Sequence, residues 1–216
     1  MTYRQYADGD PVHFGKADPS PDALYYAQPR RVVHIDDGAV RALTAVYREL
    51  LPTGGAILDL MSSWRSHLPG EIRYSRVAGL GLNAEEMADN PQLTEYAVHD
   101  LNADPTLPYR AGEFDAACCA VSVQYLQQPV QVFREIGHVL KPGGAFVVSF
   151  SNRCFPSKAV NLWLRTSDEE HSRFVAGYFA DAGNWSRMTQ RNCTTMKARL
   201  AGGDPLYAVW AYAMTP

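Results

Sequence analysis

Strand-length apolar segments alternate with helix-compatible segments through the middle of this chain, and this alternation constrains the fold more than any other feature. The strands are predicted at residues 56–60, 76–82, 95–100, 114–121 and 145–150. Alternation of this kind is typical of a parallel sheet with right-handed crossovers and helices on both faces. The sequence therefore predicts a doubly wound α/β fold.

Further helices and strands are predicted on either side of this central part. Apolar residues recur at helical spacing after Asp36, which is a candidate N-cap. Residues 167–170 have a capping-box pattern for a helix that runs to about residue 181. Closing strands are then expected at residues 185–193 and 206–213. The pattern in this last part no longer alternates regularly.

Composition limits the domain organisation and the classes of partner. The chain has 216 residues, 46% hydrophobic and 20% charged, which is enough for one large globular domain. We expect an irregular arm over residues 1–30, which covers the site, and a single domain over residues 31–216. A net charge of −3 with scattered basic residues argues against a nucleic-acid partner. The apolar runs are far shorter than the roughly 20 residues of a membrane helix.

Cysteine and histidine positions give no metal-binding pattern. Cys118 and Cys119 are adjacent in a predicted strand and must point to opposite faces, so they do not readily bridge each other. Cys154 and Cys193 stand alone, and the 6 histidines show no ligand pair at helical spacing. We expect four reduced thiols and no metal. Since residues 1–11 also lack the apolar core of a signal peptide, the expected location is cytoplasmic.

The first predicted strand ends in a turn with the layout of a nucleotide-binding loop but without its glycines. A short apolar run ends at Asp59 and is followed by small polar residues, of which Ser62 and Ser63 are the nearest substitutes for glycine. In a parallel sheet, such loops meet a ligand at the carboxyl ends of the strands. The same loop lacks the glycine-rich fingerprint of a nicotinamide-binding oxidoreductase, which makes that class less favoured.

Two segments carry a resemblance to a known family. Phe114-Asp115 opens a buried strand, and residues 139–144 (VLKPGG) precede another. Over about residues 57–152 the chain resembles the class I S-adenosylmethionine-dependent methyltransferases. The resemblance implies a Rossmann-like, mostly parallel seven-stranded sheet with an antiparallel C-terminal edge. It also implies S-adenosylmethionine as cofactor and methyl transfer as the reaction.

The chain departs from the family pattern at two places. Met61, Ser63 and Arg65 stand where the first loop of the family has glycines. Gly81 stands where the family has an acid that binds the ribose hydroxyls, and Asn83 is the nearest group able to replace it. These differences leave open a non-catalytic nucleotide-binding module, or non-methyl chemistry on the cofactor such as aminocarboxypropyl transfer or cyclisation.

The resemblance places the cofactor across four strand-end loops. In the family, an acid and the following residue hold the adenine, which corresponds to Asp100 and Leu101 here. Aromatic rings such as Tyr125, Trp64 and Tyr25 could attract the cationic sulfur. The cofactor-binding candidates are Asp59, Leu60, Met61, Ser62, Ser63, Gly81, Asn83, Asp100, Leu101, Asn102, Val121, Ser122 and Tyr125.

The remaining polar and aromatic clusters are assigned to a small-molecule acceptor. The substrate-binding candidates are Tyr25, Tyr26, Gln28, Arg30, Trp64, Asn152 and Arg153. No general base stands out, and the catalytic candidates are Tyr25, Tyr125 and Asn152. We expect that removal of the arm abolishes turnover and leaves the sheet folded.

Structural alternatives stand beside these functional readings. Asp59 could cap a turn, Asp100 could be an ordinary strand-end residue, and Tyr125 could fill the core. Trp64 could pack a helix, and Arg65 with His67 could solvate the start of one. The sequence does not indicate an oligomeric state.

Overall fold

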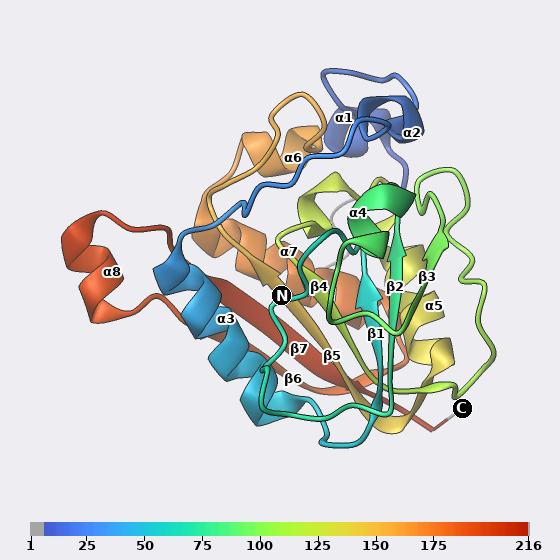
Figure 1. Ribbon diagram of the computed structural model, residues 1–216. Helices are drawn as coiled ribbons and strands as arrows, with labels where there is room; N and C mark the ends of the chain where they lie inside the picture. The colour runs from blue at the N-terminus through green and yellow to red at the C-terminus, as the bar shows by residue number, and fades with distance from the viewer. Residues whose placement is uncertain (1–6, 216) are drawn as a thin grey trace.

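A seven-stranded mixed sheet forms the centre of the protein, in a computed structural model that describes residues 7–215 (Figure 1). Its strands lie in the order β3-β2-β1-β4-β5-β7-β6. Neighbours from β3 to β5 are parallel, whereas β7 pairs antiparallel with β5 and with β6. The strands are β1 Ala56–Leu60, β2 Arg76–Gly81, β3 Glu95–Val98, β4 Phe114–Ala120, β5 Leu140–Phe150, β6 Trp185–Asn192 and β7 Tyr207–Ala213. This topology confirms the predicted fold class and its antiparallel edge.

Helices pack on both faces of the sheet. Leu43 and Tyr47 of α3 join one apolar cluster with Ile57 and Val147, and α5 and α7 contribute to a second cluster on the other face. Figure 1 shows α3 in front of the sheet and α5 with α7 behind it. The helices are α1 Pro11–Phe14, α2 Asp22–Tyr25, α3 Asp37–Leu50, α4 Ala84–Ala88, α5 Pro129–Val139, α6 Asn161–Leu164, α7 Asp168–Ala182 and α8 Met196–Ala201, with a short 3₁₀ helix η1 at Val123–Tyr125.

Local signals in the sequence explain where the longest helices begin. The Asp36 carboxylate accepts from the Ala39 N–H at the start of α3. Ser167 and Glu170 form the reciprocal capping box of α7, and Gly183 ends that helix with a φ of 79°. Adjacent residues in β4 face opposite clusters, since Cys118 joins the α3 side and Cys119 the other. Burial on both faces explains the continuous apolar character of the central strands.

The expected alternation of strand and helix is wrong at two crossovers. The connection from β1 to β2, residues 61–75, is irregular, and so is residues 99–113 between β3 and β4. The first connection carries serines, Pro69 and Gly70 in place of a helical apolar stripe, and local polar contacts compete with helix formation there. β2, β3 and β4 also end one or two residues earlier than predicted, while β5 begins earlier, at Leu140.

The N-terminal arm is more ordered than an irregular segment. Residues 1–6 lie outside the described residues, and residues 7–30 contain α1 and α2. Phe14 is buried in the main apolar cluster, and Lys16 bridges Val160 in antiparallel fashion. The arm therefore packs on the rest of the domain near the carboxyl ends of the parallel strands (Figure 1). In the part of the chain that the structure describes, no helix is long and apolar enough to span a membrane.

Candidate functional site

A cavity of about 1210 Å³, partly open to solvent, lies at the carboxyl ends of β1, β2 and β4. The N-terminal arm and the strap that follows it, defined here as residues 30–35, form one wall. Every residue that the sequence suggested for the cofactor lines this cavity. The four loops expected to meet at one sheet edge are thus together, and what each residue binds stays a prediction.

The loop after β1 keeps a glycine-like backbone without glycine. Met61, at the expected first glycine position, has a φ of 54°. Among residues 7–215, the non-glycine residues with positive φ are Met61, His67, Val121 and Arg187, and the first three line the cavity. This backbone region costs a residue other than glycine about 1–2 kcal/mol, and a β-branched residue such as Val121 rarely adopts it. Backbone strain of this kind concentrates at functional sites.

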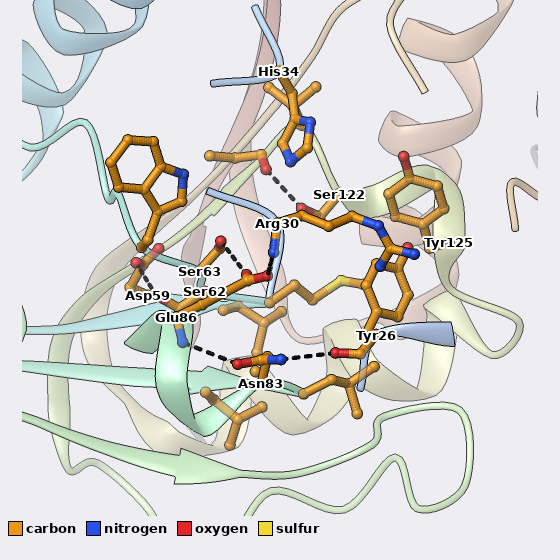
Figure 2. Close-up of a pocket in the computed structure, with 18 of the residues that line it drawn as sticks. Tyr26, Arg30, His34, Asp59, Ser62, Ser63, Asn83, Glu86, Ser122 and Tyr125 are labelled. Carbon is orange, nitrogen blue, oxygen red and sulfur yellow. Dashed lines mark hydrogen bonds between the residues drawn. The ribbon is translucent and has the colours of Figure 1, made fainter. Parts of the chain in front are cut away.

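Asp59 holds the loop in place. Its Oδ2 accepts from Ser62 Oγ at 2.6 Å (Figure 2). The same oxygen accepts from Ser66 Oγ at 2.6 Å, and the Cys118 thiol lies 3.5 Å from Oδ1. Burial raises the pKa of this carboxyl to about 6, although its hydrogen bonds act in the opposite direction. These contacts favour the turn-capping alternative for Asp59, on the wall of the cavity.

The close approach of this loop to β2 explains why the strand ends in glycine. The Ser62 N–H donates to Leu80 O at 2.8 Å. A Cβ at Gly81 would lie 2.2 Å from Ser62 O, so no side chain fits at that position. Asn83, the expected substitute, caps α4 through Oδ1 and donates from Nδ2 to Tyr26 O and Ala27 O. Its amide is therefore committed to protein contacts.

The third loop presents the candidate base pocket. Asp100 Oδ1 accepts from the Asn102 N–H at 2.9 Å, and Leu101 is buried beside it. The Asn102 amide donates to Asp22 Oδ2 at 2.8 Å and to Tyr125 O at 2.9 Å. Asn102 thus joins the arm to the loop after β4, which makes it a structural link as well as a wall residue.

The acceptor candidates divide into two groups. Tyr26, Arg30 and Trp64 line the cavity, whereas Tyr25, Gln28 and Asn152 do not. The Trp64 indole donates to Val32 O at 3.0 Å and ties the first loop to the strap. Because no helix follows β1, the helix-packing alternative for Trp64, and the helix-start alternative for Arg65 and His67, are wrong.

Arg30 is held by aromatic rings. Its guanidinium lies 4.3 Å from the centre of the Tyr25 ring and donates to Tyr25 O at 2.8 Å. Tyr26 and Phe155 also face it, each with the ring centre 5.6 Å away. Tyr25 therefore supports the cation that reaches the cavity. The Tyr125 hydroxyl accepts from the Phe155 N–H, and burial raises the pKa of Tyr125, so this hydroxyl is a poor general base.

A second cavity of about 380 Å³ adjoins the first. The two share His34, Val121, Tyr125 and Phe155, and Arg153 with Cys154 completes the lining of the second. Arg153 also pairs with Asp204 at 2.7 Å. The His34 ring points toward the first cavity (Figure 2) and packs edge-on against Phe155 at 5.1 Å. Burial lowers the pKa of His34, which keeps the imidazole neutral at pH 7.

Several wall residues were missed from the sequence. In the sequence, Glu86 is recognisable only as an acid in the first turn of a helix, and His34 has no local pattern that indicates a site. Val32 and Val33, two exposed valines of the strap, could have been suspected because they lie between the Tyr-rich arm and the first long helix. Among the described residues, no group of three or more His, Cys, Asp or Glu side chains is placed to hold a metal ion.

Comparison with known proteins agrees with this geometry. Residues 68–148 match a methyltransferase domain family. A ubiquinone biosynthesis O-methyltransferase of Xanthomonas axonopodis pv. citri is 28% identical over 123 residues, which cover 51% of this chain and 49% of that protein. The match thus spans about half the length of this curated relative.

Solved structures with the same fold align with most of this chain. An S-adenosylmethionine-dependent methyltransferase from Mesorhizobium loti has a TM-score of 0.55 at 20% identity, with 79% of this chain and 97% of that chain covered. The methyltransferase in a complex with the Haloferax volcanii Trm112 activator has a TM-score of 0.62 at 17% identity, covering 83% and 91%. The [4+2]-cyclase SpnF has a TM-score of 0.60 at 17% identity, covering 90% and 92%.

Residues 68–148 are thus similar to a methyltransferase domain, and most of the chain shares its fold with S-adenosylmethionine-dependent methyltransferases. These similarities support S-adenosylmethionine as the cofactor, and the residues present fit that group. Met61 keeps the left-handed backbone expected of a glycine in the first loop. Asp100 and Leu101 combine a carboxylate with an apolar side chain, as a base pocket requires, and the glycine at position 81 is explained by the approach of Ser62. The departures from the pattern of these methyltransferases are therefore compatible with a cofactor site in this cavity.

Proposed function

We propose that this protein transfers a methyl group from S-adenosylmethionine to a small-molecule acceptor. The observation that supports this most is the contact between the two cavities at the end of β4, where His34, Val121, Tyr125 and Phe155 line both. The first cavity is lined by the strand-end loops expected for the cofactor, and the second adjoins it as the candidate site of a small acceptor. Their shared wall is where the two ligands would meet.

The first cavity would hold the cofactor through its strand-end loops. We assign the adenine to Asp100 and Leu101, and the amino-acid part to the loop around Met61 and to the Val121–Ser122 backbone. When bound, S-adenosylmethionine supplies an electrophilic methyl group on a cationic sulfur. The Tyr125 ring would lie near this sulfur, where a cation is attracted to an aromatic face by roughly 0.5–2 kcal/mol.

The second cavity favours a compact acceptor with a hydroxyl group. Tyr125 and Phe155 offer stacked rings, with centres 6.2 Å apart, on which a flat acceptor can pack. His34 is a neutral imidazole at this wall and would accept the hydroxyl proton. The resemblance to an O-methyltransferase supports an oxygen acceptor. Holding the acceptor oxygen in line with the methyl group can supply about 7–11 kcal/mol of the barrier reduction.

The first test measures binding and product together. Calorimetry with S-adenosylhomocysteine should show binding to the wild-type protein. Incubation with S-adenosylmethionine and a panel of small phenols should yield S-adenosylhomocysteine, whereas methylthioadenosine would indicate aminocarboxypropyl transfer instead. His34→Gln should lower kcat by about a hundredfold and leave cofactor affinity unchanged. His138→Gln, on the exposed side of α5, is the control.

Two results would contradict the proposal. Absence of any calorimetric signal at millimolar S-adenosylhomocysteine would exclude cofactor binding and hence the function. Equal kcat for wild type and His34→Gln would exclude His34 as the proton acceptor and leave positioning as the source of catalysis.

A further inference from the structure

Glu86 is a buried carboxylate that faces the first cavity. It lies in the first turn of α4 and is 8% exposed. Its Oε1 accepts from the Arg30 N–H and its Oε2 from the Ser63 hydroxyl, each at 2.5 Å (Figure 2). Among residues 7–215, no salt bridge includes Glu86. An ionised carboxylate has about four acceptor positions, so two remain for a ligand.

The neighbouring groups cannot supply this acceptor. A side chain at Gly81 is excluded by the 2.2 Å approach of Ser62 O. The Asn83 amide already caps α4 and holds Tyr26 O and Ala27 O. The loop after β1 therefore leaves no room for an acidic side chain at the end of β2. Glu86, in the helix that follows β2, places a carboxylate on the same wall of the cavity.

We propose that Glu86 binds the vicinal ribose hydroxyls of the cofactor and couples this binding to the strap. The assignment rests on the proposed function, because it requires an adenosine-containing ligand in the cavity. Two hydroxyl donors match the two free acceptor positions of the carboxylate. Hydrogen bonds to a charged acceptor are stronger than those to a neutral one, so removal of the charge should weaken ligand binding strongly.

The coupling follows from the contacts of the strap. The Glu86 carboxylate, which faces the cavity, also accepts a hydrogen bond from the backbone N–H of Arg30 at the beginning of the strap. Arg31 pairs with Asp89 at 2.6 Å at the end of α4, and Val32 O accepts from the Trp64 indole. A ligand that fixes Glu86 therefore also fixes the residues that close the cavity on this side.

The test compares ribose with deoxyribose. Calorimetry is performed with S-adenosylhomocysteine and with its 2′-deoxyribose analogue. For wild type, loss of the 2′-hydroxyl should weaken binding about tenfold or more. Glu86→Gln should weaken binding of S-adenosylhomocysteine by about ten- to a hundredfold and should no longer distinguish the two ligands. Glu85→Gln, an exposed acid on the same helix, is the matched control and should behave as wild type.

Hydrogen exchange reports the coupling separately. S-adenosylhomocysteine should slow exchange at residues 31–35 in wild type, and this protection should be lost in Glu86→Gln under saturating ligand. If Glu86→Gln fails to fold by circular dichroism, Glu86→Asp keeps the charge, shortens the reach by one methylene and should show the same loss of discrimination. If wild type binds and the Glu86 variant still distinguishes S-adenosylhomocysteine from its 2′-deoxyribose analogue as well as wild type does, only the assignment of Glu86 is overturned. Failure of wild type to bind either ligand would instead overturn the proposed function.

Discussion

Asp59 both holds the loop after β1 in place and makes the stability of the folded protein depend on pH. It is 2% exposed, and its described hydrogen-bond partners are two serine hydroxyls and a thiol, none of which is charged. Burial of a charge without a cation is unfavourable, which raises the pKa of Asp59 to about 6. The folded state therefore binds a proton at Asp59 more tightly than the unfolded chain does.

This shift predicts a stability change with a definite sign. The contribution of Asp59 to stability is present below its ordinary pKa of 3.8 and is lost as the pH rises through about 6. A shift of about two units corresponds to about 3 kcal/mol. Asparagine does not titrate, so the Asp59→Asn variant lacks this contribution to the free energy of unfolding. The difference in free energy of unfolding between wild type and variant should therefore change by up to about 3 kcal/mol between pH 4 and pH 7, measured by urea denaturation. A difference that stays constant over this range would contradict the raised pKa.

Most of the predicted residues that line the cavity follow a strand, whereas Tyr26, Arg30 and Trp64 were suggested from clusters of aromatic and polar residues. Asp59 and Val121 come directly after apolar residues and Asp100 lies two residues after β3, and parallel strands bring such positions to one edge. Glu86 could not be found in this way, because an acid three residues after an N-cap is common in any helix. Its role depends on where the loop of Ser62 and Ser63 comes to lie, which is a tertiary feature.

At the scale of elements, the connection over residues 61–75 is held by polar contacts in place of a packed helix. Asn90 is 4% exposed and donates to Ser63 O and to Ser66 Oγ, each at 2.8 Å. Gln92 makes two further hydrogen bonds with the Leu68 backbone. These side chains follow α4, so that helix and its C-terminal turn act as a support for the first loop.

Replacement of Asn90 by Asp should test this support. Aspartate has nearly the same shape but cannot donate, so the Ser63 carbonyl loses its hydrogen bond. We expect a loss of about 1–3 kcal/mol in the free energy of unfolding. Hydrogen exchange should also become faster at residues 62–68. Asp89→Asn, whose side chain is half exposed, is the control and should change stability little. Unchanged exchange in the loop of Asn90→Asp would show that other contacts hold it.

The elements differ in how well the sequence predicts them. The beginnings of α3 and α7 were predicted because their caps are local, in Asp36 and in Ser167 with Glu170. The β1–β2 crossover was predicted wrongly as helical, because its structure comes from Asn90 and Gln92, which are distant in sequence. The early start of β5 at Leu140 likewise depends on pairing with Phe114 across an irregular register.

At the scale of the whole molecule, the arm is part of the domain. Lys158 is fully buried, and its ammonium donates to Ser20 O at 2.7 Å and Ser20 Oγ at 3.1 Å. Asp18 Oδ2 lies 3.1 Å from it and Asp22 Oδ1 3.4 Å. The arm in turn carries Tyr26 and Arg30 to the cavity. The expectation that removal of residues 1–30 leaves a folded sheet is thus opposed by the structure, since it would leave Lys158 unpaired and open the core at Phe14.

Lys158→Met therefore tests how strongly the arm is joined to the sheet. Methionine fills similar space but cannot hold Ser20 or the two aspartates, and breaking a buried ion pair from one side costs about 3–5 kcal/mol. Lys141→Met is the matched control, because Lys141 pairs with Asp115 at 2.7 Å but is 52% exposed and should cost less than about 1 kcal/mol. Urea denaturation measures both losses, and limited proteolysis should cut the Lys158→Met protein first within residues 16–28. Equal losses in the two variants, with no early cleavage of the arm, would show that the arm is only a surface segment and that the cavity wall does not depend on it.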